Sequence, residues 1–160
     1  KTNIGNVNKI KFKNITFKYK KNIIFENVST TFDLKKIIHI EGESGVGKTT
    51  FARLLINQCE TENNLKKSEV LSPTFNIVFE YDVKEFTIKH YDLYRLKSDS
   101  DIKNIGLFED LKKTITLIEW PKLIKKKPLN RIDLFFEHTQ DMNERLLIIK
   151  TSGRLKNYEF

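Results

Sequence analysis

The sequence predicts an α/β fold with a mixed, mainly parallel central sheet and an N-terminal antiparallel β hairpin. Three observations predict this fold. Apolar residues alternate along residues 10–32, a short apolar run at 37–41 leads into a glycine-rich loop, and an amphipathic helical pattern follows at 49–59. Strand, loop and helix in this order, followed by further short apolar strands and few helices, are typical of an α/β domain.

Length and composition favour one globular domain. The chain has 160 residues, of which 39% are hydrophobic, so we expect a single domain over 1–160, with a basic, β-rich segment at 1–36 and a core at 37–160. No apolar run approaches the roughly 20 residues of a membrane-spanning helix, and the N-terminal stretch lacks the apolar segment of a signal peptide. We therefore expect a cytoplasmic protein. Cys59, the single cysteine, is expected to be a buried core residue.

The N-terminal segment carries most of the net charge. Residues 1–36 hold nine lysines and two acidic residues, which is +7 of the total +8. Alternating apolar residues predict two strands joined by a turn at 20–22, and the change of phase near Asn14 predicts a β-bulge. Clustered lysines favour either a surface for nucleic acid or an acidic partner, or a solvated sheet edge. The same alternatives apply to a second cluster at 122–127.

The remaining elements are expected from periodicity and from turn residues. In chain order we expect a buried strand at 37–42, a helix at 49–59, a loop at 60–69, strands at 75–81 and 86–91 around a turn at 82–85, a helical stretch at 99–112 interrupted by Gly106, a buried strand at 114–118, a loop or short helix between Pro121 and Pro128, and a terminal hairpin at 132–136 and 146–149.

One motif between the buried strand and the helix points to phosphate binding. It reads, in order, Gly42, Glu43, Ser44, Gly45, Val46, Gly47, Lys48 and Thr49, and it matches the phosphate-binding loop of nucleoside triphosphatases in full. Its glycines let backbone N–H groups turn toward phosphate oxygens, and the helix N-terminus adds its positive dipole end. We predict that residues 43–50, which include Thr50, bind a nucleoside triphosphate. Lys48 would contact the β and γ phosphates, and the Thr49 hydroxyl would bind Mg²⁺.

A metal-bound triphosphate also needs an acidic residue at the end of a neighbouring strand. Glu119 fits best, because it ends the apolar run at 115–118 and is followed by Trp120 and Pro121. Asp92, after the strand that includes His90, is the second candidate. Either carboxylate is alternatively a surface group or a helix cap. Trp120 either contacts the nucleotide or fills the core, and the core is the default for a tryptophan.

A short segment after the polar loop has the composition of a switch. The hydroxyls of Ser72 and Thr74 can reach a γ phosphate or its attacking water, and Pro73 between them fixes a turn. His39 and His90 are expected to be packed or hydrogen-bonded rather than catalytic. Arg95 is either a charge-stabilising residue or a structural one.

Five segments together resemble the TsaE family, also called YjeE, in their order and spacing. They are residues 42–50, 72–75, 90–96, 106–107 and 118–121, within a resemblance that covers about residues 38–136. The resemblance implies a small P-loop ATPase that uses ATP and Mg²⁺ and assists the TsaB and TsaD proteins in making threonylcarbamoyladenosine in tRNA. By motif position it implies that Lys48 and Thr49 act on phosphate and Mg²⁺, that Glu119 is the second Mg²⁺ ligand, and that Asp92 is needed for ATPase activity. Hydrolysis is expected to be slow for the chain alone and stimulated by partners.

The N-terminal segment differs from that family and is similar to the opening of an ABC ATPase domain. This second resemblance implies that an aromatic residue at about the position of Tyr19 stacks on adenine. The chain lacks the downstream signature of ABC ATPases. Two alternatives to the TsaE-type ATPase stay open. One is a nucleotide-gated module that binds tRNA or protein, and the other is an ABC-like regulatory ATPase.

Overall fold

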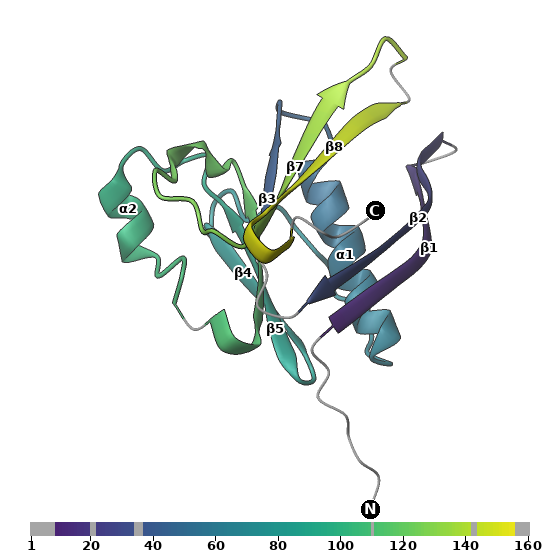
Figure 1. The fold of residues 1–160 in the computed structure, drawn as a ribbon, viewed down its shortest axis with the longest axis horizontal. Coiled ribbons are helices and arrows are strands. Elements are labelled where there is room, and N and C mark those ends of the chain that lie inside the picture. The colour runs from purple at the N-terminus through teal and green to yellow at the C-terminus, as the bar shows by residue number, and fades with distance from the viewer. Residues whose placement is uncertain (1–8, 20–21, 34–36, 110, 142–143, 156–160) are drawn as a thin grey trace, which may run out of the picture.

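The computed structural model describes residues 9–19, 22–33, 37–109, 111–141 and 144–155, with side chains from residue 37 onward. Figure 1 shows a central sheet with α1 (Lys48–Glu62) against one of its faces. The sheet has six strands in the spatial order β4-β5-β6-β3-β7-β8. Their bounds are β3 (Ile37–Gly42), β4 (Val78–Val83), β5 (Phe86–Asp92), β6 (Thr114–Glu119), β7 (Arg131–His138) and β8 (Arg145–Ser152).

The four central strands are parallel and the two edge strands are antiparallel. β3 pairs with β6 on one side and with β7 on the other, and β6 pairs with β5, all in parallel. β4 and β8 close the sheet as antiparallel hairpin partners of β5 and β7. The predicted mixed, mainly parallel sheet is confirmed. Its parallel strands end at one edge, which is where ligands bind in open α/β sheets.

The N-terminal hairpin forms a separate two-stranded sheet. β1 (Lys9–Tyr19) and β2 (Asn22–Asp33) pair antiparallel, with a register shift between Phe12 and Ile15. This shift lies where the change of apolar phase predicts a bulge, because one extra residue moves the alternation to the other face. The turn between the two strands lies outside the described residues.

The two faces of the six-stranded sheet bury separate apolar clusters. Even-numbered residues of β3, such as Ile38 and Ile40, pack with Ile56 and other residues of α1. Ile37 and Ile118 face the other way and pack with Ile102 of α2 (Asp99–Asn104). The central strands are buried on both faces, which explains why they read as continuous apolar runs.

Several element boundaries differ from expectation, and three of the differences are informative. The helix α1 continues to Glu62. The buried Glu60 carboxylate accepts hydrogen bonds from the Ser68 backbone and hydroxyl, and these bonds fix the position of the loop that follows the helix. β4 begins at Val78 rather than at residue 75, because 73–76 form a turn. The helical stretch at 99–112 is α2 followed by turns, with Gly106 at φ +60°, and by the short 3-10 helix Leu111–Lys113.

Candidate nucleotide and metal site

The loop between β3 and α1 has the backbone that its glycines predict. Gly42, Gly45 and Gly47 have φ values of +150°, +76° and +110°. A Cβ on Gly42 would lie 2.7 Å from the Phe136 carbonyl oxygen, whereas a Cβ on Gly45 or Gly47 would meet nothing within 4 Å. The loop therefore packs against β7 at its base and is open at its tip. Because Gly47 caps α1 without a side-chain hydrogen bond, the N–H groups of the first turn are left for an anion.

Lys48 lies folded beneath this loop. Its Nζ donates to the carbonyl oxygens of Gly42 and Glu43, at 2.9 and 2.6 Å, and lies 4.0 Å from the ring centroid of Trp120. The residue is 5% exposed. Burial lowers the pKa of Lys48, while the negative charges of Glu119 and Asp92 act in the opposite direction. The loop, the indole ring and two carboxylates thus surround one ammonium group.

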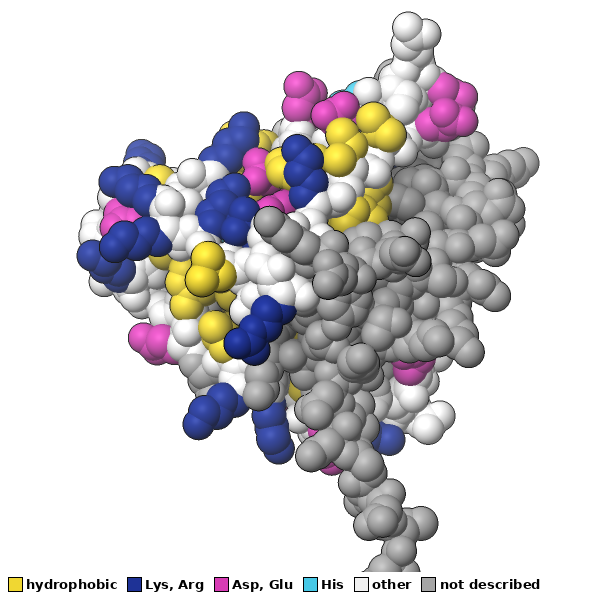
Figure 2. Space-filling view, in the orientation of Figure 1, with side chains coloured by type: hydrophobic (Ala, Val, Ile, Leu, Met, Phe, Trp, Pro, Cys, Tyr) yellow, Lys and Arg dark blue, Asp and Glu magenta, His cyan; other side chains and the backbone are white. Residues whose placement is uncertain are grey.

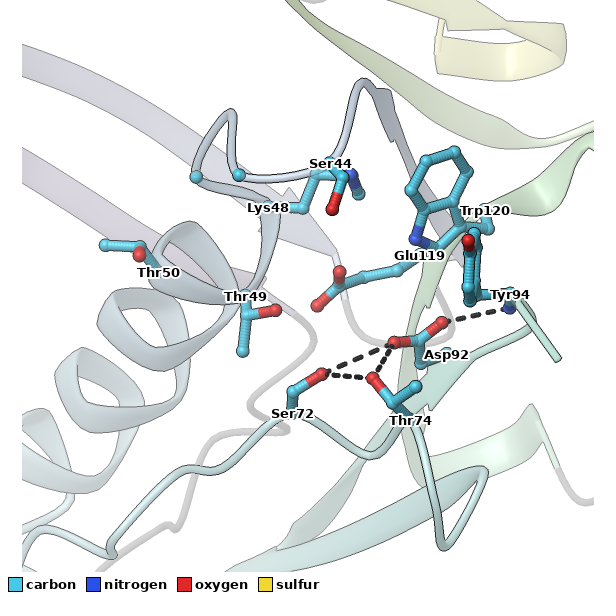
Figure 3. Close-up of a pocket in the computed structure, with 12 residues that line it drawn as sticks. Ser44, Lys48, Thr49, Thr50, Ser72, Thr74, Asp92, Tyr94, Glu119 and Trp120 are labelled. Atoms are coloured by element: carbon cyan, nitrogen blue, oxygen red, sulfur yellow. Dashed lines mark hydrogen bonds between the residues drawn. The ribbon is translucent and has the colours of Figure 1, made fainter.

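The two predicted carboxylates come from adjacent strand ends. Asp92 ends β5 and Glu119 ends β6, and the two residues are register partners in the parallel ladder. Both are buried, at 3% and 2% exposure. Figure 3 shows the Glu119 carboxylate pointing toward the side of Thr49, with Asp92 next to it. Residues that lie far apart in the chain therefore meet at the carboxyl edge of the sheet.

Asp92 holds the segment that was predicted to be a switch. Its Oδ2 accepts hydrogen bonds from the hydroxyls of Thr74 at 2.6 Å and Ser72 at 3.3 Å, and its Oδ1 accepts from the Tyr94 backbone at 3.0 Å (Figure 3). These bonds hold the turn at 73–76 at the site, where it does not extend β4. Pro73, between the two hydroxyl residues, is buried. The carboxylate thus links the switch segment to the end of β5.

Glu119 is held by a histidine from the neighbouring strand. Its Oε1 lies 2.9 Å from Nε2 of His90, a residue with 0% exposure. His39, on β3, is equally buried and lies 2.9 Å from Asp133 through its Nδ1. Both histidines are hydrogen-bonded as expected, on opposite faces of the sheet.

One pocket of about 330 Å³ brings most of the predicted site residues together. The predicted residues that line it are Ser44, Gly45, Gly47, Lys48, Thr49, Thr50, Ser72, Thr74, Asp92 and Glu119. Val46 is different, because its side chain is buried in the core beneath the loop, so that its backbone alone can serve a phosphate. Glu43 lines a neighbouring pocket of about 560 Å³, which shares Ser44 and Trp120 with the first. Tyr19 ends β1, but its side chain lies outside the described residues, so the base contact stays a prediction.

The sequence did not predict that two aromatic residues of the pocket belong to the site. Trp120, for which the core was preferred, lines both pockets and covers Lys48. It has φ +57°, and its backbone N–H donates to the Ile40 carbonyl, which turns the ring over the end of the sheet. Tyr94 packs on it, with ring centroids 5.0 Å apart, and is 63% exposed. The available signal was position near a strand end, because Trp120 directly follows β6 and Tyr94 lies two residues after β5.

The pocket fits a magnesium-bound triphosphate chemically. Mg²⁺ prefers oxygen ligands and keeps several waters, so that one or two protein ligands plus phosphates suffice. The Thr49 hydroxyl and the Glu119 carboxylate line the same pocket, and the loop above them leaves room for phosphate at Gly45 and Gly47. Within the described residues, no group of three His, Cys, Asp or Glu side chains forms a metal site by itself.

Other candidate residues lie outside the pocket. Burial raises the pKa of the Cys59 thiol to about 12, as expected for an inert core residue. Arg95 stacks over the exposed Phe75 ring at 5.0 Å. In the second lysine cluster, Lys127 pairs with Glu41 at 3.2 Å, while Lys125 and Lys126 line a groove beside α2, the side on which Figure 2 shows many basic side chains. No helix in the described part of the chain is long and apolar enough to cross a membrane.

Comparison with known proteins decides the family. The family model described as threonylcarbamoyl adenosine biosynthesis protein TsaE matches residues 17–147. The chain belongs to the TsaE family. A TsaE protein of Rickettsia conorii is 39% identical over 126 residues, which cover 77% of this chain and 68% of that protein. One from Rickettsia felis is 40% identical over 120 residues, covering 73% and 66%. The chain thus spans about two thirds of the length of these relatives.

A solved structure shares the fold. The crystal structure of Bacillus subtilis YdiB aligns with a TM-score of 0.52 and 24% identity, over 74% of this chain and 69% of that chain. The likeness shows that this fold occurs in a solved structure. Family membership and fold together indicate a nucleotide-binding protein with a role in threonylcarbamoyladenosine biosynthesis.

Proposed function

We propose that this chain is a Mg²⁺-dependent ATPase that supports the TsaB and TsaD proteins in the threonylcarbamoyladenosine modification of tRNA, in the cytoplasm. The observation that carries the proposal is the convergence of Lys48, Thr49, Asp92 and Glu119 on one pocket beneath an open phosphate loop. The single domain over 1–160 is part of this proposal.

Different residues of the pocket bind the phosphates, hold the metal and orient the attacking water. The backbone N–H groups of the loop and of the first turn of α1 bind the phosphates, and Lys48 moves its ammonium from the Gly42 and Glu43 carbonyls to the β and γ phosphates. Thr49 and Glu119 would hold Mg²⁺, which supplies charge neutralisation on the transferring phosphoryl group. Asp92 orients the attacking water through the Ser72 and Thr74 hydroxyls that it holds.

ATP turnover with and without TsaB, TsaD and tRNA tests this function. We expect slow hydrolysis by the chain alone and stimulation by the full set. Thr49→Ala should abolish Mg²⁺-dependent turnover, because it removes a proposed metal ligand. Thr61→Ala is the matched control, since Thr61 lies on the same helix, is exposed, and its hydroxyl bonds only to the Asn57 carbonyl among described groups. Unchanged turnover in Thr49→Ala would contradict the metal assignment.

The position of the base is a separate part of the proposal. Tyr19 is one candidate, and the 560 Å³ pocket that adjoins the phosphate loop through Ser44 and Trp120 is the other. Tyr19→Ala and Phe135→Ala distinguish them, because Phe135 lines that pocket. The variant that weakens binding of a non-hydrolysable ATP analogue identifies the side on which the base lies.

A nucleotide-gated binding module is a second candidate, favoured by one observation. Leu71, Phe75 and Tyr94 are 52%, 84% and 63% exposed. Leu71 and Phe75 flank the two hydroxyl residues that Asp92 binds, and Tyr94 donates its own backbone N–H to Asp92. Nucleotide binding at Asp92 would therefore reach this apolar rim directly. Partner binding that needs ATP, with negligible turnover even in the presence of TsaB, TsaD and tRNA, would favour the module over the ATPase. Loss of that binding at high salt would point to tRNA as the partner.

A further inference from the structure

We propose that His90 is a positioning residue that fixes one oxygen of the Glu119 carboxylate so that the other oxygen faces the metal. This inference rests on the proposed function, and it assigns to His90 a role in Mg²⁺ binding rather than in the chemistry itself.

The geometry of the pair supports a directed role. His90 and Glu119 lie on the same face of neighbouring parallel strands, because Asp92 is the register partner of Glu119 and His90 lies two residues before Asp92. The Nε2–Oε1 distance is 2.9 Å, and both side chains are sealed from solvent, at 0% and 3% exposure. Among the described residues no second donor reaches the Glu119 carboxylate, although the Leu93 backbone N–H donates to the Glu119 backbone carbonyl. One carboxylate oxygen is thus anchored and the other is available to the pocket that Glu119 lines.

In the described part of the chain, the His90 side chain makes no second hydrogen bond. Its Nδ1 is buried and has no hydrogen-bond partner among the described residues. A carboxylate that binds a cation can only accept a hydrogen bond, so the proposed role requires that the donor of the pair is Nε2 of His90. An apolar side chain would fill this place in the core without leaving a buried nitrogen unpaired, and such replacements are often neutral for stability. Stability alone therefore does not explain a histidine here, whereas orientation of a metal-ligating carboxylate does.

Three variants of the full chain test the inference. His90→Asn removes the donor, because the asparagine amide ends at the position of Nδ1 and does not reach Glu119. His90→Gln keeps an N–H near the position of Nε2. His39→Gln is the matched control, since it removes the Nδ1 donor from an equally buried histidine that is bonded to Asp133 on the other face.

The measurement is binding of a non-hydrolysable ATP analogue over a range of Mg²⁺ concentrations and in EDTA. We expect His90→Asn to raise the Mg²⁺ concentration needed about 10-fold or more, with His90→Gln within about threefold of wild type. Affinity in EDTA and the Mg²⁺ dependence of His39→Gln should not change. Equal effects of His90→Asn and His90→Gln, or no effect of His90→Asn, would overturn the inference while leaving the proposed function intact. A wild-type chain that binds no nucleotide would overturn both.

A second measurement needs no variant and keeps the test valid if His90→Asn fails to fold. Nitrogen-15 NMR of the wild-type imidazole rings reports which ring nitrogen is protonated. We expect His90 to carry its proton on Nε2 and its resonance to shift when Mg²⁺ is added to the nucleotide complex. A proton on Nδ1 alone would overturn the inference, because Nε2 would then have nothing to donate.

Discussion

The two faces of the central sheet carry the same chemical pair with different surroundings. On the α1 face, His90 lies 2.9 Å from Glu119, and on the opposite face His39 lies 2.9 Å from Asp133. Asp133 is also bound by Arg131, at 3.1 and 2.9 Å through its two oxygens, whereas Glu119 has an oxygen left for the pocket. The pair of His39 and Asp133 is therefore structural, because both carboxylate oxygens have a hydrogen-bond or ion-pair partner. The pair of His90 and Glu119 is suited to ligand binding, because one carboxylate oxygen has no such partner among the described residues.

The largest effect is expected from Glu119→Gln, which tests the pair of His90 and Glu119. Losing the negative charge should lower Mg²⁺-dependent ATP turnover by about 100-fold or more, because a neutral amide is a poor ligand for a hard cation. Steady-state hydrolysis with the partner proteins measures it. Glu62→Gln, an exposed change at the end of α1, is the control. Turnover equal to wild type would remove the distinction between the two faces.

Asp133→Ala tests the pair of His39 and Asp133 on the opposite face. Removing this carboxylate leaves Arg131 and His39 without their shared partner, and we expect the free energy of unfolding to fall by about 3 kcal/mol. Urea titration followed by circular dichroism measures this change. Turnover per folded molecule should be unchanged. A loss of turnover without loss of stability would mean that this face also serves the site.

A smaller effect is expected from pH. It changes the free energy of unfolding through His39, on the face opposite α1. Burial lowers the pKa of His39 below its ordinary 6.5; Asp133 opposes this shift, and the positive charges of Lys127 and Arg131 add to it. The unfolded chain therefore binds a proton at this residue at a higher pH than the folded chain does. Its contribution to stability is present above about pH 6.5 and is lost as the pH falls toward the folded pKa. Unfolding of wild type and His39→Gln at about pH 7.5 and about pH 5.5 measures it. An equal loss in both proteins would show that His39 is not its source.

The smallest effect is expected from Lys127→Ala. The ion pair with Glu41 is partly exposed, so its removal should change stability by less than about 1 kcal/mol. Because Lys127 also lowers the pKa of His39, the variant should lose less stability on acidification than wild type. The same pH series checks this difference. A larger loss than in wild type would contradict the direction of the Lys127 effect.

Local patterns predicted most of the elements. The alternation in β1 and β2, the buried runs of β3 and β6, and the terminal hairpin of β7 and β8 were expected from residues alone. Two of the wrong boundaries share one cause. The start of β4 and the end of α1 depend on the Asp92 and Glu60 carboxylates, which bind loop groups 8 to 20 residues away in the chain. Such contacts leave no periodic signal in the sequence.

The phosphate loop and its two carboxylates were also predictable, since each lies next to a strand whose pattern is visible. Glycine spacing determines the backbone of the loop, and an acidic residue directly after an apolar run must lie near the carboxyl edge of a parallel sheet. By contrast, the preference for a core role of Trp120 was wrong in part, because its left-handed backbone turns the ring over Lys48.

The sequence by itself determined the sheet type, the phosphate loop and the residues available to it, since these follow from periodicity and from the conformational freedom of glycine. Tertiary structure alone decided which histidine meets which carboxylate. Strand order brings β5 beside β6 and β7 beside β3, so that His90 faces Glu119 and His39 faces Asp133. The physical reason is that partners 29 and 94 residues apart in the chain become neighbours only when the parallel strands align in register.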